Sequence, residues 1–199
     1  MTRAPASEPI VRFAELLAAA QAVERALLPE PTAMSLATAS AGGLPSLRIV
    51  LLKGVDAKGF VFYTNLGSRK ARDLRENPRA SLCFHWPPLE VQVRIDGTVE
   101  TVPDEEADAY FATRPRISQL GAWASRQSEP VAASEDLALR LRELERFYEG
   151  RDVPRPPHWS GFRLEPLRIE FWHNRPFRLH DRDLYTREGD GWRVERLYP

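Results

Sequence analysis

The sequence predicts a mainly β fold with peripheral helices, arranged as an antiparallel closed or split barrel. Six to eight segments have the composition or the two-residue alternation of strands, and many of them follow one another across short turns. Helical patterns are fewer and lie between groups of strands. A parallel doubly wound sheet needs a helix between successive strands, so the sequence favours the antiparallel barrel.

Length and charge limit the possible classes of protein. The chain has 199 residues and a mass of 22.7 kDa, which suits one domain with a substantial core. We expect this domain to span residues 9 to 199, after a disordered tail over residues 1 to 8. Lys and Arg together number 28, as do Asp and Glu, so the overall charge indicates no nucleic acid and no membrane partner.

Cysteine content and hydropathy add further limits. Cys83 is the single cysteine, which excludes an intramolecular disulfide, and its apolar neighbours predict a buried core position. No apolar run reaches the roughly 18 residues of a membrane-spanning helix, and the N-terminus lacks a signal-peptide pattern, so we expect a cytoplasmic protein. The four histidines have no ligand spacing with carboxylates or thiols, so we expect no metal site.

The first half of the chain predicts one long helix followed by strands. Pro9 opens an amphipathic helix that continues to about Leu28, where prolines end it. Strands are predicted at Ala33–Thr38, Ser46–Lys53, Phe60–Thr64, Ser81–Trp86 and Leu89–Val102. Because short turns join the first three strands, we expect them to form a meander.

The second half predicts three helices and then three strands. The helices are expected from Pro103 to just before Pro115, over Ile117–Ala124, and over Glu135–Tyr148 with Ser134 as its N-cap. The strands are expected at Gly161–Trp172, Phe177–Thr186 and Trp192–Leu197. A turn over Glu188–Gly191 should join the last two strands as a hairpin.

A row of cations near the C-terminus is the first candidate for a site. In an extended strand Arg178, His180 and Arg182 would project from one face, because side chains alternate between the two faces. Like charges on one face repel, so such a row is stable either in open water or against an anionic ligand. Aromatic and apolar neighbours favour the ligand, but a solvated arginine-rich strand remains an alternative.

A second basic element lies at the start of a short helix. Ser68 is a candidate N-cap for a helix from Arg69 to about Glu76, which Asn77 and Pro78 would end. Arg69 and Lys70 oppose the positive end of the helix dipole, whereas the free backbone N–H groups there favour an anion. A bound phosphate would resolve this conflict. Two side chains that simply extend into solvent are the alternative.

Other cations have weaker patterns. Arg48 and Lys53 stand at the two ends of an apolar strand, where cations often just reach water. Tyr110 and Arg114 share one helical face, and Ser118 follows closely enough to complete a phosphate cup, although a Tyr–Arg surface pair would look the same. The sequence contains no glycine-rich phosphate loop, dinucleotide fingerprint or nucleophile elbow, so side chains and helix ends would have to hold any phosphate.

Taken in order, these segments resemble the pyridoxamine 5′-phosphate oxidase family from about Glu8 to Pro199. The resemblance is carried by Arg48–Lys53, Phe60–Asn65, Ser68–Lys70, Gln92–Arg94, Tyr110–Pro115, Ser118–Ser128, Pro156–Trp159, Glu170–Trp172, Arg178–Arg182 and Glu195–Pro199. Several long motifs in the same order are far more specific than any one of them.

The resemblance implies an FMN-binding split barrel that works as a homodimer, with two flavin sites between the subunits. The implied FMN contacts are Arg48, Tyr63, Thr64, Arg69, Lys70, Gln92, Gln127, Ser128, Trp172 and Arg182. The implied contacts of the substrate phosphate are Lys53, Tyr110, Arg114 and Ser118. Arg178 and His180 would be the catalytic pair, placed against the pyridine ring at the reacting carbon.

The implied reaction is FMN-dependent oxidation of pyridoxamine or pyridoxine 5′-phosphate to pyridoxal 5′-phosphate, with oxygen reduced to hydrogen peroxide. The alternatives are a related oxidase of a bulkier, phenazine-type aromatic substrate, or a carrier of flavin or pyridoxal phosphate without catalysis. Two departures stand out. Arg3 and Arg12 do not match the Arg and Tyr of the family's N-terminal lid, and Val91 replaces a longer, more basic residue.

Overall fold

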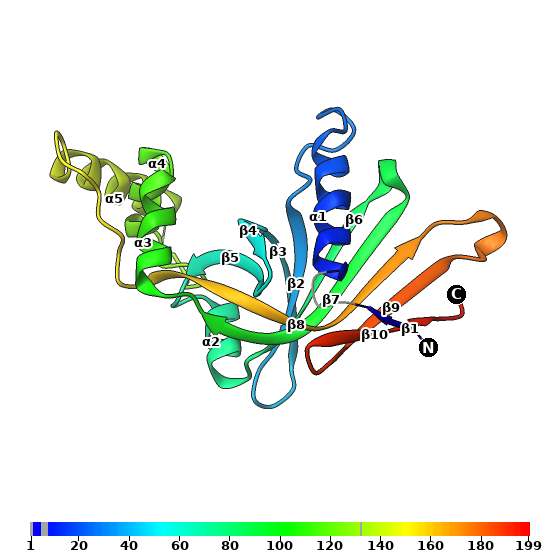
Figure 1. The fold of residues 1–199 in the computed structure, drawn as a ribbon. Coiled ribbons are helices and arrows are strands. Elements are labelled where there is room, and N and C mark those ends of the chain that lie inside the picture. Colours follow the sequence, from blue (N-terminus) through cyan, green and yellow to red (C-terminus); the bar gives the residue numbers. More distant parts are fainter. Residues whose placement is uncertain (1, 5–7, 132) are drawn as a thin grey trace.

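The computed structural model describes residues 2–4, 8–131 and 133–199, and within them all strands belong to one antiparallel sheet (Figure 1). The strands are β1 (Thr2–Ala4), β2 (Ala33–Ala39), β3 (Pro45–Leu51), β4 (Gly54–Asp56), β5 (Gly59–Asn65), β6 (Arg79–Trp86), β7 (Val91–Thr101), β8 (Trp159–His173), β9 (Asp181–Glu188) and β10 (Gly191–Arg196). The helices are α1 (Glu8–Gln21), α2 (Arg69–Glu76), α3 (Asp104–Thr113), α4 (Arg116–Ala124) and α5 (Ser134–Phe147), with short 3₁₀ turns η1 (Pro87–Leu89) and η2 (Pro176–Arg178).

The long strand β8 produces the split of the barrel. One of its edges pairs with β7, whereas its other edge pairs with β5 at one end and with β9 at the other. The ladder between β7 and β8 shifts register between Asp96 and Gly97, opposite Pro166, which has no N–H to donate. A Cβ atom on Gly97 would lie 2.0 Å from the carbonyl oxygen of Glu165, so only glycine fits there. The predicted antiparallel split barrel is therefore confirmed.

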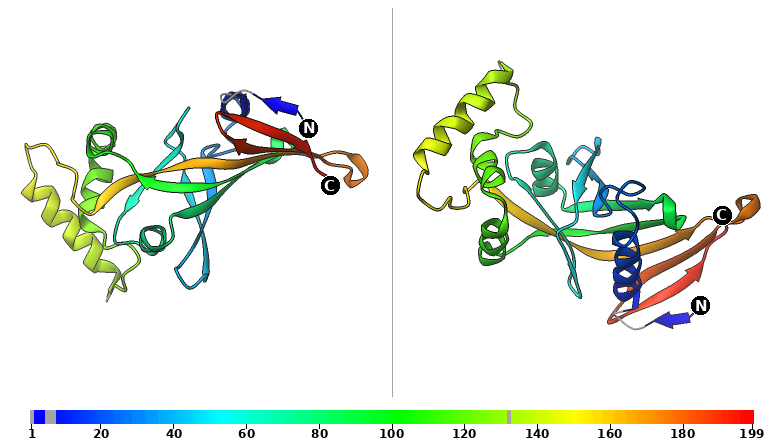
Figure 2. Two further views of the ribbon diagram at one scale, coloured as in Figure 1. Left: turned by 60° about the horizontal axis from the view of Figure 1, so that its bottom comes forward. Right: turned by 90° about the horizontal axis from the view of Figure 1, so that it is seen from above.

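The main core lies between the curled sheet and α1. Phe13 of α1 is fully buried and contacts the rings of Phe60, Phe84 and Trp86, with centroid distances of 4.9, 4.9 and 5.9 Å. Helices α3, α4 and α5 gather at the far end of the sheet from β9 and β10 (Figures 1 and 2). Among the described residues, no helix has the length and apolarity needed to cross a bilayer.

Two predictions about the strands were wrong. Strands β2 and β3 pair as expected, but β5 pairs with β4 and β8 and therefore does not continue a meander from β3. Cys83 is half-buried rather than a core residue, since Leu82 and Phe84 beside it on β6 occupy the core-facing positions. Burial nevertheless raises the pKa of the Cys83 thiol.

Element ends also differ from the predictions. Helix α1 ends at Gln21, and a series of turns covers the residues up to Leu28. The N-cap of α5 is Ala133 rather than Ser134. At the N-terminus, where we expected a disordered tail over residues 1 to 8, Thr2–Ala4 form β1 along β10 and Glu8 belongs to α1, while residues 1 and 5–7 lie outside the described residues.

Candidate active site

A cleft of about 1000 Å³ opens between β3, β5, α2, α3 and the segment that follows α4. It brings together most of the predicted site residues, although their positions in the sequence are far apart. Those that line it are Arg48, Lys53, Tyr63, Thr64, Arg69, Lys70, Tyr110, Arg114, Ser118, Gln127 and Ser128. The predicted FMN-phosphate group and the predicted substrate-phosphate group therefore share one cleft.

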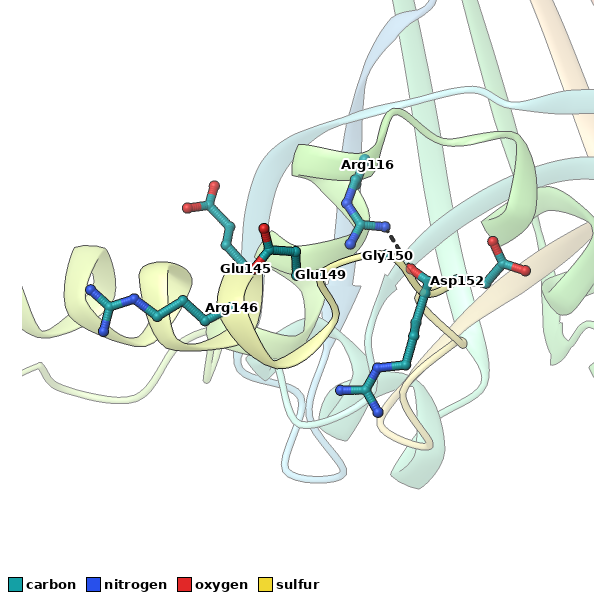
Figure 3. A pocket seen from close by; sticks show the side chains of 7 residues that line it. Arg116, Glu145, Arg146, Glu149, Gly150 and Asp152 are labelled. Atoms are coloured by element: carbon teal, nitrogen blue, oxygen red, sulfur yellow. Dashed lines mark hydrogen bonds between the residues drawn. The ribbon is translucent and has the colours of Figure 1, made fainter.

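A smaller depression of about 450 Å³ lies on α4 and α5 and holds none of the predicted residues (Figure 3). Arg116 in this depression donates hydrogen bonds to the carbonyl oxygens of Arg151 (2.9 Å) and Tyr148 (2.6 Å). Tyr148 is the C-cap residue of α5, and Arg151 lies in the turn that follows this helix. Carbonyl groups at a helix end lack intrahelical partners, and Arg116 supplies donors there. We therefore assign Arg116 to the structure of the α5 terminus.

Lys70 is the most buried cation of the large cleft. Its ammonium donates hydrogen bonds to Thr64 Oγ1 at 3.0 Å and to Gln127 Oε1 at 3.1 Å. Burial, with a further contribution from the positive charge of Arg48, lowers the pKa of Lys70 to about 8. A dianion beside this ammonium would favour its charged form.

Arg48 is held in place by β2 and α2. Its guanidinium donates to the carbonyl oxygen of Leu36 (3.1 Å) and to Thr38 Oγ1 (2.8 Å), and it lies 3.8 Å from an oxygen of buried Asp73. Burial lowers the pKa of Arg48, and Asp73 partly offsets that effect. Arg48 therefore enters the cleft as an oriented cation.

The start of α2 suits an anion. Ser68 is the N-cap residue as predicted, but its hydroxyl makes no capping hydrogen bond and is buried without a partner. The backbone N–H of Arg69 donates to Ser128 Oγ at 3.3 Å. Free N–H groups at a helix start, an orphaned hydroxyl and nearby cations are the donors that a phosphate requires. These residues fit the phosphate of a flavin mononucleotide.

Three aromatic rings also line the cleft. The rings of Tyr63 and Tyr110 are stacked at 4.0 Å, and Trp159 lies nearly parallel to Tyr63 at 5.2 Å. Burial raises the pKa of Tyr63 to about 12, with smaller contributions from Glu106 and Tyr110. Gly161 makes room for this stack, since a Cβ atom there would lie 2.7 Å from the Tyr63 ring.

The remaining predicted residues form a second group outside the cleft. Gln92 pairs with Trp172 across β7 and β8, and Trp172 pairs with Arg182 across β8 and β9. The ring of His180 lies 4.6 Å from that of Trp172. This end of the sheet is opposite the end that carries α3 and α4 (Figures 1 and 2). A single chain therefore presents two separate surfaces of predicted site residues.

The prediction of one extended cationic face was wrong. Arg178 belongs to η2, with φ of 62°, and strand β9 begins only at Asp181. Phe177 also has a positive φ, of 58°, so the chain turns sharply before the strand begins. Arg178 is exposed, whereas His180 is half-buried and accepts a hydrogen bond at Nδ1 from the backbone N–H of Arg175 (3.2 Å).

Sequence reasoning missed several residues that hold the site together. Trp159 lines the cleft and supports Arg114, and Glu170 accepts two hydrogen bonds from Arg182, at 2.8 and 3.1 Å. The signal available in the sequence for Glu170 was a carboxylate between the apolar residues Ile169 and Phe171 of a predicted strand. Arg12, which did not match the family's lid residues, packs over Phe171 at 4.2 Å and pairs with Asp183.

Comparison with known families covers most of the chain. Residues 20–173 match the family described as pyridoxamine 5′-phosphate oxidase, and residues 159–199 match the pyridoxine 5′-phosphate oxidase C-terminal dimerisation region. The chain belongs to the pyridoxamine 5′-phosphate oxidase family. The predicted family and oxidoreductase class are thereby confirmed, and the dimerisation region indicates a homodimer.

Curated relatives agree with this assignment. A pyridoxine/pyridoxamine 5′-phosphate oxidase from Rubrobacter xylanophilus is 63% identical over 175 residues, which cover 88% of this chain and 81% of the relative. One from Myxococcus xanthus strain DK1622 is 57% identical and covers 96% of this chain and 92% of its own.

Solved structures share the fold. PhzG from Burkholderia lata, in complex with tetrahydrophenazine-1-carboxylic acid, has a TM-score of 0.89 at 34% identity and covers 96% of this chain and 92% of its own. A pyridoxamine 5′-phosphate oxidase-related, FMN binding protein from Nostoc punctiforme has a TM-score of 0.72 at 19% identity and covers 93% of this chain and 96% of its own. The second likeness concerns the fold alone.

Proposed function

We propose that this protein oxidises pyridoxine 5′-phosphate or pyridoxamine 5′-phosphate to pyridoxal 5′-phosphate, with FMN as its cofactor and oxygen as the final acceptor. The exocyclic carbon of the substrate loses a hydride and its hydroxyl or amino group loses a proton, and oxygen finally gains these two electrons and two protons as hydrogen peroxide. With the amine substrate, the product imine takes up water and releases ammonia. The cytoplasmic location stays a prediction.

One observation carries the proposal: a single cleft contains two separate sets of anion donors. Lys70, Arg48 and the start of α2 form the first set, which fits the FMN phosphate. Arg114 and Tyr110 belong to the second set, which is completed by Lys53 and Ser118 and fits the substrate phosphate. Two phosphorylated aromatic molecules bound in this way would lie next to each other.

We assign the second surface to the same site through the homodimer. Gln92, Trp172 and Arg182 form one neighbourhood with His180 and lie outside the cleft of their own chain. A second copy related by two-fold symmetry would place this neighbourhood over the cleft of its partner. In a homodimer this arrangement creates two equivalent sites.

Within such a site the protein's contribution is orientation and charge placement. FMN supplies the acceptor for the hydride that leaves the exocyclic carbon. The cleft fixes the substrate phosphate, and Arg178 steers the pyridine ring from the other subunit. His180 hydrogen-bonds to the substrate, and its ring nitrogens can donate or accept a proton there.

Oxygen uptake by the FMN-loaded protein tests the proposal. Pyridoxine 5′-phosphate and pyridoxamine 5′-phosphate should each support uptake with formation of hydrogen peroxide, and unphosphorylated pyridoxine should require a far higher concentration. If neither phosphate supports uptake while a phenazine precursor does, the phenazine-type alternative is correct. If flavin binds but no substrate is oxidised, the carrier alternative is correct.

The phenazine-type alternative has one observation in its favour, the TM-score of 0.89 with PhzG. The two curated relatives named for pyridoxine/pyridoxamine 5′-phosphate, at 57% and 63% identity, are closer in sequence than the 34% of PhzG. The second set of donors also requires a substrate with an anionic group, since a neutral substrate would leave Arg114 unpaired.

A further inference from the structure

Arg114 lies in the cleft without an anionic partner. The described residues form no ion pair with it, and its Nη1 atom is buried without a hydrogen-bond partner. Burial lowers the pKa of this guanidinium, and Tyr110 partly offsets the effect. A buried N–H donor without an acceptor is costly unless a ligand supplies one.

The ring of Trp159 packs against this guanidinium. The guanidinium carbon of Arg114 lies 4.7 Å from the centroid of the Trp159 ring and 5.5 Å from that of Phe111. An indole ring is the most favourable aromatic surface for a cation. Because the ring is neutral, it orients the guanidinium and leaves the positive charge available to an anion, which a carboxylate in the same place would not do.

The indole is itself held firmly. It is 6% exposed, lies nearly parallel to Tyr63 at an interplanar angle of 4°, and meets the edge of Phe111 at 5.1 Å. Arg155 donates to the carbonyl oxygen of Trp159 at 2.9 Å and forms ion pairs with two carboxylates of α3, Asp104 and Asp108. Arg155 thus links the start of β8 to the helix that carries Tyr110 and leads into Arg114.

We propose that Trp159 is a positioning residue for the substrate phosphate: held by Arg155, it fixes the Arg114 guanidinium with Nη1 free to bind that phosphate. This inference rests on the proposed function. It adds that the contact between Trp159 and Arg114 makes the protein prefer phosphorylated over unphosphorylated vitamers. Neither Trp159 nor Arg155 needs to touch the reacting atoms.

Calorimetric binding of pyridoxal 5′-phosphate and of pyridoxal to the FMN-loaded protein tests the proposal. Trp159→Leu should weaken binding of pyridoxal 5′-phosphate about tenfold, because the guanidinium would then have to be ordered when the phosphate binds, and should leave pyridoxal unchanged. Trp159→Phe keeps a ring and should show a smaller loss, of about threefold. Arg155→Met should show a phosphate-selective loss of similar size to that of Trp159→Phe.

A double-mutant cycle tests whether Trp159 affects phosphate binding through Arg114. In an Arg114→Ala background, Trp159→Leu should cost no further affinity for pyridoxal 5′-phosphate, because its effect acts through the missing guanidinium. An equal loss in both backgrounds, or an equal loss of pyridoxal, would overturn the positioning role and leave the proposed function intact. Failure of the unmodified, FMN-loaded protein to bind pyridoxal 5′-phosphate would overturn both.

Folding is checked separately. Trp159→Phe should lower the unfolding temperature only modestly, because the smaller ring leaves part of the packed space empty, and should retain FMN. A loss of affinity that is confined to the phosphorylated ligand therefore cannot come from misfolding. If Trp159→Phe binds pyridoxal 5′-phosphate as tightly as the unmodified protein and Trp159→Leu does too, the ring has no positioning role.

Discussion

Lys70 of α2 donates a hydrogen bond to Gln127 Oε1 across 3.1 Å, so the start of a helix is joined to the segment that follows α4. The contact explains how two adjacent cations can stand at the positive end of a helix dipole. Lys70 turns into the cleft and meets oxygen acceptors, among them Thr64 Oγ1 at 3.0 Å. A phosphate bound beside it would add the missing negative charge.

The affinity for FMN should fall as the pH rises above about 8. Lys70 has a pKa of about 8 in the protein, and a bound phosphate raises that pKa, so binding takes up a proton above pH 8. Affinity should then decrease by up to about tenfold per pH unit. FMN fluorescence titrations at several pH values between 7 and 9 measure this change in affinity. Lys70→Arg, whose charge does not titrate in this range, should remove most of the dependence.

The same pKa has a consequence for the stability of the flavin-free protein. An ordinary lysine titrates near 10.5, and folding lowers the pKa of Lys70 to about 8. Between these values the unfolded chain binds more protons than the folded one, so Lys70 makes the free energy of unfolding rise with pH in this window. Urea titrations at pH 8 and 10 should show a smaller rise in Lys70→Met. An unchanged slope would show that Lys70 is not desolvated.

Replacing Arg178 should impair turnover far more than flavin binding. We expect Arg178→Ala to lower kcat about a hundredfold or more, because the substrate ring loses its steering cation, and to change the dissociation constant of FMN less than about threefold. Stopped-flow flavin reduction and FMN titration measure the two effects. Arg168→Ala, at an exposed position of β8, is the matched control and should change neither. Equal losses of turnover and of FMN affinity would show that Arg178 has a different role.

A methyl group at Gly161 should destabilise the protein. The added Cβ would lie 2.7 Å from the Tyr63 ring and 2.9 Å from a methyl carbon of Val102, and overpacking of this kind costs about 1–3 kcal/mol. Denaturant unfolding of Gly161→Ala measures the loss. Gly121→Ala is the control, since its Cβ would meet nothing within 4 Å and alanine favours a helix interior. Unchanged stability in Gly161→Ala would show that the aromatic stack can move freely.

Local signals predicted the short elements well. Helix α2 runs from Arg69 to Glu76 as expected, with Ser68 at the N-cap position and Pro78 shortly after its end. The hairpin between β9 and β10 also forms as expected at Gly189, whose φ is 56°. In both places the residues that determine the backbone conformation are neighbours in the sequence.

Long-range pairing and unusual backbone were not predictable in this way. Strand β5 pairs with β8, about a hundred residues away, and no local pattern distinguishes that partner from β3. Phe177 and Arg178 have positive φ values although neither residue type signals them, so the sequence suggested a continuous strand. The contact of Arg114 with Trp159 likewise depends on tertiary structure, whereas the spacing of Tyr110, Arg114 and Ser118 was compatible with a phosphate cup and equally with a Tyr–Arg surface pair.

Complementation between two defective variants tests the central claim that each site combines the cleft of one subunit with the Arg178 surface of the other. Arg114→Ala and Arg178→Ala homodimers should each be nearly inactive. Random assortment of differently tagged chains makes half of the dimers hybrid, each with one intact site, so the mixture should recover about a quarter of the unmodified turnover. Hybrid dimers isolated through both tags that show no more activity than the parent variants would contradict the claim.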